Sequence, residues 1–222
     1  MHLLYLHGFR SSPNSFKAQR LQAWLAAHRP ELRWWCPQLP PSPAAAWALI
    51  TQGIADWPRA QMAVVGSSLG GFYATAVAEA TGCRAMLLNP AVDPARDLAA
   101  YIGEQTQFHS PEETFFFRPE YIAELQALRV PALTDLARYG AVIAKGDEVL
   151  DWREMLGLFG NAAGAALTAG AAPTAGAPEA AVRLLPGSDH AISDFDAHMP
   201  FILYFLNLLP GSVPANTTER QV

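Results

Sequence analysis

A serine flanked by glycines follows directly on an apolar run, and this segment restricts the possible folds more than any other. Met62–Val65 is apolar throughout, as expected of a buried strand, and residues 66–71 read Gly-Ser-Ser-Leu-Gly-Gly. A strand that turns sharply into a helix leaves no room for side chains two positions before and after the central serine. Gly66 and Gly70 occupy those two positions. We therefore predict a strand–turn–helix elbow with Ser68 at its tip.

Short apolar runs alternate with helical patterns along the rest of the chain. Six runs are predicted to be buried strands: His2–Leu6, Leu32–Cys36, Met62–Val65, Ala85–Leu88, Ala141–Ala144 and Val182–Leu185. This alternation predicts an α/β fold, with a mostly parallel sheet of about six strands and helices on both faces. Ligands of such sheets bind at the carboxyl ends of the strands. We expect one domain over residues 1–209 and a disordered polar tail at 210–222.

Composition and charge exclude several classes of function. The chain of 222 residues has a net charge of −5 and no basic stripe, which argues against a nucleic-acid partner. Met1–Phe9 lacks a positive leader segment, and the longest apolar block, Phe201–Leu206, is too short to span a bilayer. Cys36 and Cys83 have no metal-type spacing and fit reduced thiols in a cytoplasmic protein. We predict no metal and no cofactor.

Two more strand ends carry the residues that a nucleophilic serine requires. Asp147 lies in the tight turn after the fifth predicted strand, and His190 follows the sixth. The chain order Ser, Asp, His is that of an α/β-hydrolase and not of the two unrelated serine protease arrangements. We therefore predict that Ser68 is the nucleophile, that His190 is the general base, and that Asp147 orients the imidazole.

Other residues compete for the same roles. Asp151 is the alternative acid, although an acid at the start of the next helix already has a structural reason. Three more acids flank the histidine: Asp189, Asp194 and Asp196. His7 is the next candidate for the base, but a histidine at this position more often fixes the loop through hydrogen bonds. For Ser68 itself, the competing interpretation is a capping serine in a glycine-rich turn.

Two backbone amides are placed to hold an oxyanion. Leu69 follows the nucleophile at the start of the predicted helix, where the helix dipole favours negative charge. The second amide is expected from Phe9, because Gly8 lets the loop after the first strand approach the serine. We predict that the oxyanion hole consists of the Phe9 and Leu69 amides.

Several segments together resemble one known family. They are residues 5–9 (Tyr-Leu-His-Gly-Phe), 11–13 (Ser-Ser-Pro), 37–40 (Pro-Gln-Leu-Pro), 66–71, 89–92 (Asn-Pro-Ala-Val), 146–150 (Gly-Asp-Glu-Val-Leu) and 189–190 (Asp-His). These resemble the small bacterial esterases of the YqiA type in the α/β-hydrolase superfamily, over Met1–Leu209. The resemblance implies a compact hydrolase of acyl esters or thioesters whose serine, acid and histidine fall on Ser68, Asp147 and His190. The family usually has a glycine where this chain has Ser188.

A long excursion separates the fourth and fifth predicted strands. Residues Ala91–Tyr139 are too many for a simple crossover, so we expect a small helical cap over the site. Five aromatic residues there are candidates to line an acyl pocket: Phe108, Phe115, Phe116, Phe117 and Tyr121. Core packing explains them equally well, and at least one of the three consecutive phenylalanines is expected in the core. Asn161–Ala180, rich in alanine and glycine, is predicted to be a flexible insertion.

The predicted function is that of an esterase working through an acyl-enzyme intermediate on a small-molecule acyl ester or thioester. The elbow does not encode the leaving group, so an acyl-CoA thioesterase with the same triad remains an alternative. A ligand-binding homologue without turnover is another, because fold and triad alone do not establish activity.

Overall fold

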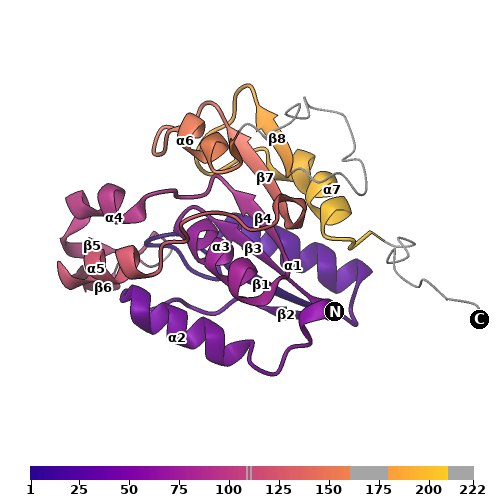
Figure 1. The fold of residues 1–222 in the computed structure, drawn as a ribbon, viewed down its shortest axis with the longest axis horizontal. Coiled ribbons are helices and arrows are strands. Elements are labelled where there is room, and N and C mark those ends of the chain that lie inside the picture. The colour runs from indigo at the N-terminus through magenta and orange to yellow at the C-terminus, as the bar shows by residue number, and fades with distance from the viewer. Residues whose placement is uncertain (109, 111, 161–179, 210–222) are drawn as a thin grey trace, which may run out of the picture.

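A six-stranded parallel sheet forms the centre of the molecule (Figure 1). The computed structural model describes residues 1–108, 110, 112–160 and 180–209. The strand order is β2-β1-β3-β4-β7-β8, and every neighbouring pair is parallel. The strands are β1 His2–Leu6, β2 Arg33–Trp35, β3 Met62–Ser67, β4 Arg84–Leu88, β7 Tyr139–Ala144 and β8 Ala181–Leu185. Each coincides with one of the six predicted runs, so the expected α/β-hydrolase fold is confirmed.

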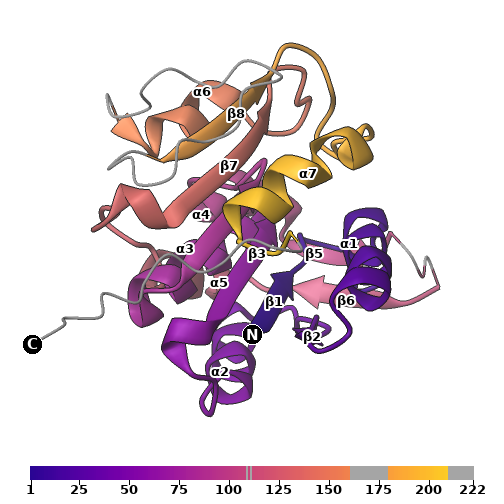
Figure 2. The ribbon, with the colours of Figure 1, turned by 90° about the vertical axis from the view of Figure 1, so that its right-hand side faces the viewer.

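Helices cover both faces of this sheet (Figure 2). Helices α1 (Phe16–His28) and α7 (Phe195–Phe205) pack against one face, which includes Leu3 and Tyr5. The opposite face, which includes Leu4 and Leu6, is covered by α2 (Pro43–Gly53), α3 (Leu69–Thr81) and α6 (Trp152–Gly157). Successive side chains of a strand point to opposite faces, so a strand buried on both sides must be apolar throughout. This is why continuous apolar runs located the strands.

The excursion between β4 and β7 contains more than the expected helices. It includes α4 (Pro94–Asp97), α5 (Glu120–Ala127) and the short 3-10 helices at Leu98–Tyr101 and Leu136–Arg138. It also includes an antiparallel hairpin of β5 (Gly103–Thr106) and β6 (Thr114–Phe117). These strands have four residues each, too few for a pattern of alternation to identify. A further 3-10 helix, Arg59–Gln61, precedes β3.

Two predicted segments lie outside the described residues. They are the flexible insertion at 161–180, of which only Ala180 is described, and the disordered tail at 210–222. In the described part of the chain, no helix has the length and apolarity needed to cross a membrane.

Candidate active site

Ser68 stands at the turn between β3 and α3 with a strained backbone. Its φ of 56° and ψ of −121° are unusual for a residue with a side chain. Three backbone hydrogen bonds hold it there. The Ser68 amide donates to the Leu88 carbonyl at 3.0 Å, and the Ser68 carbonyl accepts from Gly71 at 2.8 Å and from Ala91 at 3.0 Å. The strain is therefore maintained by β4 and by the residues just beyond it.

The two elbow glycines are required by close backbone contacts. A Cβ atom on Gly70 would lie 1.9 Å from the Leu6 carbonyl oxygen, and one on Gly66 would lie 2.2 Å from the Gly70 oxygen. Both distances are far below any van der Waals contact. Any other residue would push α3 away from β1, so the glycine pattern that predicted the elbow has a steric cause in the fold.

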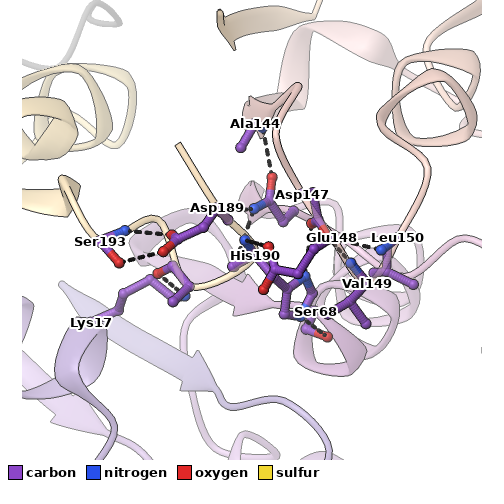
Figure 3. A network of polar contacts seen from close by, with 12 residues as sticks. Lys17, Ser68, Ala144, Asp147, Glu148, Val149, Leu150, Asp189, His190 and Ser193 are labelled. Carbon is purple, nitrogen blue, oxygen red and sulfur yellow. Dashed lines mark hydrogen bonds and ion pairs between the residues drawn. The ribbon is translucent and has the colours of Figure 1, made fainter. Parts of the chain in front are cut away.

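The structure brings the three predicted triad residues together (Figure 3). His190 Nε2 lies 3.0 Å from Ser68 Oγ, and His190 Nδ1 lies 2.7 Å from Asp147 Oδ2. The Asp147 carboxylate is fully buried, and its Oδ1 accepts hydrogen bonds from the amides of Val149 and Leu150, each at 2.8 Å. With both oxygens engaged, the carboxylate is fixed as an acceptor of the Nδ1–H. Nε2 is then left unprotonated toward the serine hydroxyl.

Asn89 links the loop of the histidine to the strand of the acid. It is fully buried and has a φ of 42°. Its Nδ2 donates to the carbonyls of Asp189 (3.0 Å) and His190 (3.2 Å), and its Oδ1 accepts from the Ala144 amide (2.8 Å). Glu148 Oε2 adds a hydrogen bond from the His190 amide at 3.0 Å. In the sequence, Asn89 belongs to a family motif, and its place directly after a buried strand is a further signal for this site.

The loop before His190 passes very close to the turn that carries Asp147. A Cβ atom on Gly146 would lie 2.3 Å from the Ser188 carbonyl oxygen. Ser188 adopts a φ of 66°, in the left-handed region that favours glycine, and its hydroxyl donates to Asp194. The glycine that the resemblance implies at this position thus has a conformational reason, and this chain places a hydrogen-bonded serine there instead.

The competing acids have other partners. Asp151 caps α6 by accepting from the Arg153 amide at 2.9 Å. Asp189 accepts two hydrogen bonds from Ser193, which lower the pKa of this carboxyl. Asp196 bonds to Arg20 of α1, and Asp194 bonds to Ser188 in the loop after β8 and to His198 of α7. Only Asp147 reaches the His190 ring among these candidates.

The loop after β1 runs against the nucleophile. A Cβ atom on Gly8 would lie 3.2 Å from Ser68 Cβ, so a side chain there would crowd the serine. Within the described residues, the amides of Phe9 and Leu69 donate no backbone hydrogen bond, which leaves both available to a ligand. His7 Nε2 accepts from the Leu39 amide at 3.0 Å, and its Nδ1 lies 2.9 Å from the Gly8 carbonyl. His7 thus holds the loop, as expected, and both ring nitrogens are engaged.

Arg10 fastens the cap to this loop. Its Nε donates to the Thr106 carbonyl at 2.7 Å and its Nη2 to the Thr106 hydroxyl at 2.9 Å. The Arg10 carbonyl accepts from the Phe108 amide at 2.8 Å, and the guanidinium lies 4.6 Å from the Phe108 ring centroid. These contacts therefore attach the β5–β6 hairpin to the loop that carries the Phe9 amide.

Two cavities meet at Ser68 and His190. The larger, of about 480 Å³, lies toward α1, and it is lined by aromatic residues (Tyr5, Phe9, Phe16 and Phe108) as well as by Ser11, Ser15, Lys17 and Ser193. The smaller, of about 290 Å³, is lined mainly by apolar residues: Leu69, Ala91, Leu98, Tyr101, Phe108, Val149 and Leu150. A third cavity of about 290 Å³ borders Phe9 and includes Leu39, Tyr73 and Phe115.

The five cap aromatics have different surroundings. Phe108 lines both cavities at the serine, and Phe115 lines the third cavity. Phe117 is 1% exposed and packs edge-on against Phe9, so it belongs to the core, as expected for at least one of the three. Tyr121 stacks edge-on against Phe117, whereas Phe116 is 57% exposed. In the described residues, no group of three or more His, Cys, Asp or Glu side chains is arranged to hold a metal ion.

Comparison with known proteins supports the assignment of the fold. The chain is similar to mouse alpha/beta hydrolase domain-containing protein 10, with 15% identity and a TM-score of 0.61, over 90% of this chain and 86% of that one. It is also similar to Est1E from Butyrivibrio proteoclasticus (13% identity, TM-score 0.63, 93% and 88% covered). A third similar structure is the esterase domain of a Rhodothermus marinus protein (15% identity, TM-score 0.56, 93% and 84% covered).

The sequence itself matches a family over most of its length, including the segments that carry the elbow and the acid. The match covers residues 2–165, and it agrees with the YqiA-type resemblance. On this evidence the chain belongs to UPF0227, an uncharacterised protein family.

Proposed function

We propose that the protein is a serine hydrolase that cleaves acyl esters. The observation that carries this proposal is the pair of hydrogen bonds that joins Asp147 through His190 to Ser68, on a turn whose strained backbone is held at three points. Nucleophilic catalysis by serine needs this arrangement of nucleophile, base and orienting acid. The similar structures that are named as hydrolases and esterases support the same class.

Each residue has a defined task in this reaction. Ser68 Oγ attacks the acyl carbonyl carbon while His190 Nε2 takes the hydroxyl proton, and the carbonyl oxygen becomes an oxyanion. The Phe9 and Leu69 amides donate to that oxyanion. The bond to the leaving alcohol then breaks, and the alcohol takes the proton from His190. A water molecule next attacks the acyl-enzyme and passes its proton to His190. Ser68 departs with that proton, and the carboxylic acid is released.

Covalent labelling tests this proposal directly. A fluorophosphonate probe is expected to attach to Ser68, as mapped by peptide mass spectrometry, and heat-unfolded protein is expected not to react. Ser68→Ala should abolish both labelling and turnover of p-nitrophenyl esters. Hydrolysis at the wild-type rate by Ser68→Ala would refute the proposal. A folded wild-type protein that neither labels nor turns over any ester would instead indicate a ligand-binding protein.

The leaving group requires a separate comparison. p-Nitrophenyl esters and acyl-CoA thioesters of the same chain lengths present one acyl group with two leaving groups. A higher kcat/KM for esters at every length is the expected result. A consistent preference for the thioesters would assign the protein to the thioesterases without changing the roles of Ser68, His190 and Asp147.

A further inference from the structure

Both cavities that meet at Ser68 have mainly apolar surfaces. The larger one lies toward α1, and the smaller one includes residues of α4. Four residues border both cavities: Phe9, Ser68, Phe108 and His190. Three of the four have tasks in the proposed reaction, and Phe108 is the exception. A substrate held at the serine therefore meets apolar surface on both sides of the reacting carbonyl, and Phe108 borders each side.

The charged side chains at the two cavities have partners within the protein. In the larger cavity, Lys17 donates to the Ala191 carbonyl at 2.5 Å. In the smaller one, Asp97 accepts from Arg96 Nε at 2.8 Å, and Arg10 is bonded to the cap hairpin. A ligand need not carry a charge to satisfy these groups. The apolar part of the surface is therefore the larger source of affinity at this site.

Exposed apolar side chains gather around the same two cavities. Among the described residues, seven large apolar side chains are exposed, and four of them line a cavity at Ser68: Phe16, Tyr101, Phe108 and Val149. A single exposed apolar residue is ordinary at a protein surface, whereas a group of them around a cleft is typical of a binding site. A group that covers these side chains gains affinity by removing them from water, which requires that it be apolar itself.

Each cavity also has an aromatic side chain that does not line the other. Phe16, the first residue of α1, is half exposed and lines the larger cavity but not the smaller. Tyr101 of the cap is 40% exposed, packs edge-on against Phe9, and lines the smaller cavity but not the larger. Neither side chain is buried in the core. Each can therefore be replaced to test one cavity at a time.

Phe108 is fixed on one side and free on the other. Its amide donates to the Arg10 carbonyl at 2.8 Å, and the Arg10 guanidinium lies 4.6 Å from the centroid of its ring. The side chain nevertheless remains mostly exposed. The contacts with Arg10 thus hold the ring at the border of both cavities and leave most of its surface free to contact a ligand.

We propose that the site binds esters with an apolar group on each side of the scissile bond, one in each cavity, and that Phe108 is a specificity-determining residue in contact with both groups. The inference rests on the proposed hydrolase activity and narrows its substrates to esters that join an apolar acid to an apolar alcohol. Acyl-CoA thioesters fit less well, because they would place a chain with polar amide groups in one of the two apolar cavities.

Two series of esters test the two sides separately. Both start from methyl acetate: one lengthens the acyl group to methyl hexanoate, and the other lengthens the alcohol to pentyl acetate. The rates are divided by those of alkaline hydrolysis, so that differences in intrinsic reactivity cancel. Complete burial of one methylene group raises kcat/KM about fourfold, which corresponds to about 0.8 kcal/mol. Over four added methylene groups, we expect a rise of at least about tenfold in each series.

The failure of this inference differs from the failure of the proposed function. A series in which kcat/KM does not rise with chain length would overturn the inference, because one side of the ester would then make no apolar contact. Turnover of methyl acetate that is lost in Ser68→Ala would still leave the proposed hydrolase function intact.

Substitutions assign each side chain to one series through the ratio of kcat/KM between its longest and shortest members. Phe16→Ala should lower this ratio at least about threefold in one series, and Tyr101→Ala should do so in the other. Phe108→Ala should lower both ratios, and Phe108→Leu should retain part of each. Tyr204→Ala is the matched control, because it removes a 40% exposed aromatic side chain of α7 that lines neither cavity, and it should change neither ratio. Effects of Phe16→Ala and Tyr101→Ala on the same series, or an effect of Phe108→Ala on fewer than two, would contradict the assignment.

Binding without turnover separates this inference from the proposed activity. An NMR titration of Ser68→Ala compares propyl butyrate with methyl butyrate and propyl acetate, which lack methylene groups on the alcohol side and on the acyl side respectively. Propyl butyrate should bind at least about threefold more tightly than either shorter ester, and Phe108→Ala in the same background should reduce both differences. Equal affinities for propyl butyrate and either shorter ester would overturn the inference, whether or not the wild-type protein hydrolyses esters.

Discussion

Two regions of the site are held in place in different ways. One is the floor, which consists of the turns and loops at the strand ends that carry Ser68, Asn89, Asp147 and His190, and the other is the cap. On the floor, the fully buried Asp147 and Asn89 each make three hydrogen bonds to strand ends and loops, and these bonds fix the loop of His190. The cap, residues 91–139, is fastened to the oxyanion loop through Arg10. It exposes 63% of Phe108 and 57% of Phe116. The comparison indicates that buried polar bonds fix the proposed catalytic residues, whereas these two phenylalanines of the cap are little constrained by packing.

The floor also contains most of the backbone strain. Ser68, Asn89 and Ser188 all adopt positive φ, as does the fully buried Ile192 in the loop after His190. Such conformations cost about 1–3 kcal/mol for residues with side chains, and they persist only where the surrounding structure enforces them. Here the enforcement comes from the hydrogen bonds of Asn89 and from the packing of the helices against the sheet. A change to the floor should therefore affect catalysis more than stability, and a change to the cap should do the opposite.

The largest expected effect belongs to the orienting acid. Asp147→Asn should lower kcat about a thousandfold or more, because the amide favours the wrong tautomer of His190, and the melting temperature should change little. Asp151→Asn is the matched control. It removes the charge of a carboxylate four residues away, while the asparagine oxygen can still cap α6, so it should cost less than about 1 kcal/mol of stability and leave kcat nearly unchanged. The reverse result in steady-state kinetics would make Asp151 the acid.

A smaller loss of kcat is expected when Asn89 is replaced. Asn89→Asp keeps the shape and the acceptor for the Ala144 amide but removes the two bonds donated to the Asp189 and His190 carbonyls. We expect kcat to fall about ten- to a hundredfold through misplacement of the histidine. KM should change little, because Asn89 lies beneath the histidine loop.

Labelling kinetics separate positioning from a general loss of structure. The rate at which the fluorophosphonate reacts with Ser68 should fall with kcat in Asn89→Asp, at a temperature where the variant remains folded. A variant that melts earlier but labels at the wild-type rate would show that Asn89 serves stability alone.

The fold and the catalytic floor were accessible from the sequence because both depend on local patterns. The strands are mostly apolar, and Ser68, Asp147 and His190 lie within about five residues of the ends of three of them. The contacts that connect distant segments were not accessible. Arg10 bonds to Thr106, 96 residues away, and Lys17 bonds to Ala191, 174 residues away. Such pairs depend on how loops meet in space, and neither residue type specifies its partner. The β5–β6 hairpin was missed because a strand of four residues is too short to show a period.

Within the cap, the neighbouring Phe116 and Phe117 test how far stability depends on the burial of a side chain. Phe117 is 1% exposed, so Phe117→Ala should cost about 3–5 kcal/mol of unfolding free energy and lower the activity on all esters together. Phe116 is 57% exposed, so Phe116→Ala should change stability by no more than about 0.5 kcal/mol. Urea unfolding of the two variants measures both values. A shift in acyl-chain preference in Phe117→Ala, without loss of stability, would place Phe117 in the acyl pocket rather than the core.

The smallest expected effect lies in the histidine loop, at a strained position that has no contact with the triad side chains. Ser188 has a φ of 66° and donates a hydrogen bond to Asp194. Ser188→Gly removes a conformational penalty of about 1–2 kcal/mol and loses a partly exposed hydrogen bond of about 1 kcal/mol, so the two contributions nearly cancel. We expect a change in stability within about 1 kcal/mol of zero, and kcat within about twofold, because Asn89 and Glu148 still hold the backbone of His190. Ser188→Val is the matched control, since a β-branched residue at this φ is strained and should destabilise the loop. A tenfold change of kcat in Ser188→Gly would mean that the serine, and not the buried bonds of the floor, positions the histidine.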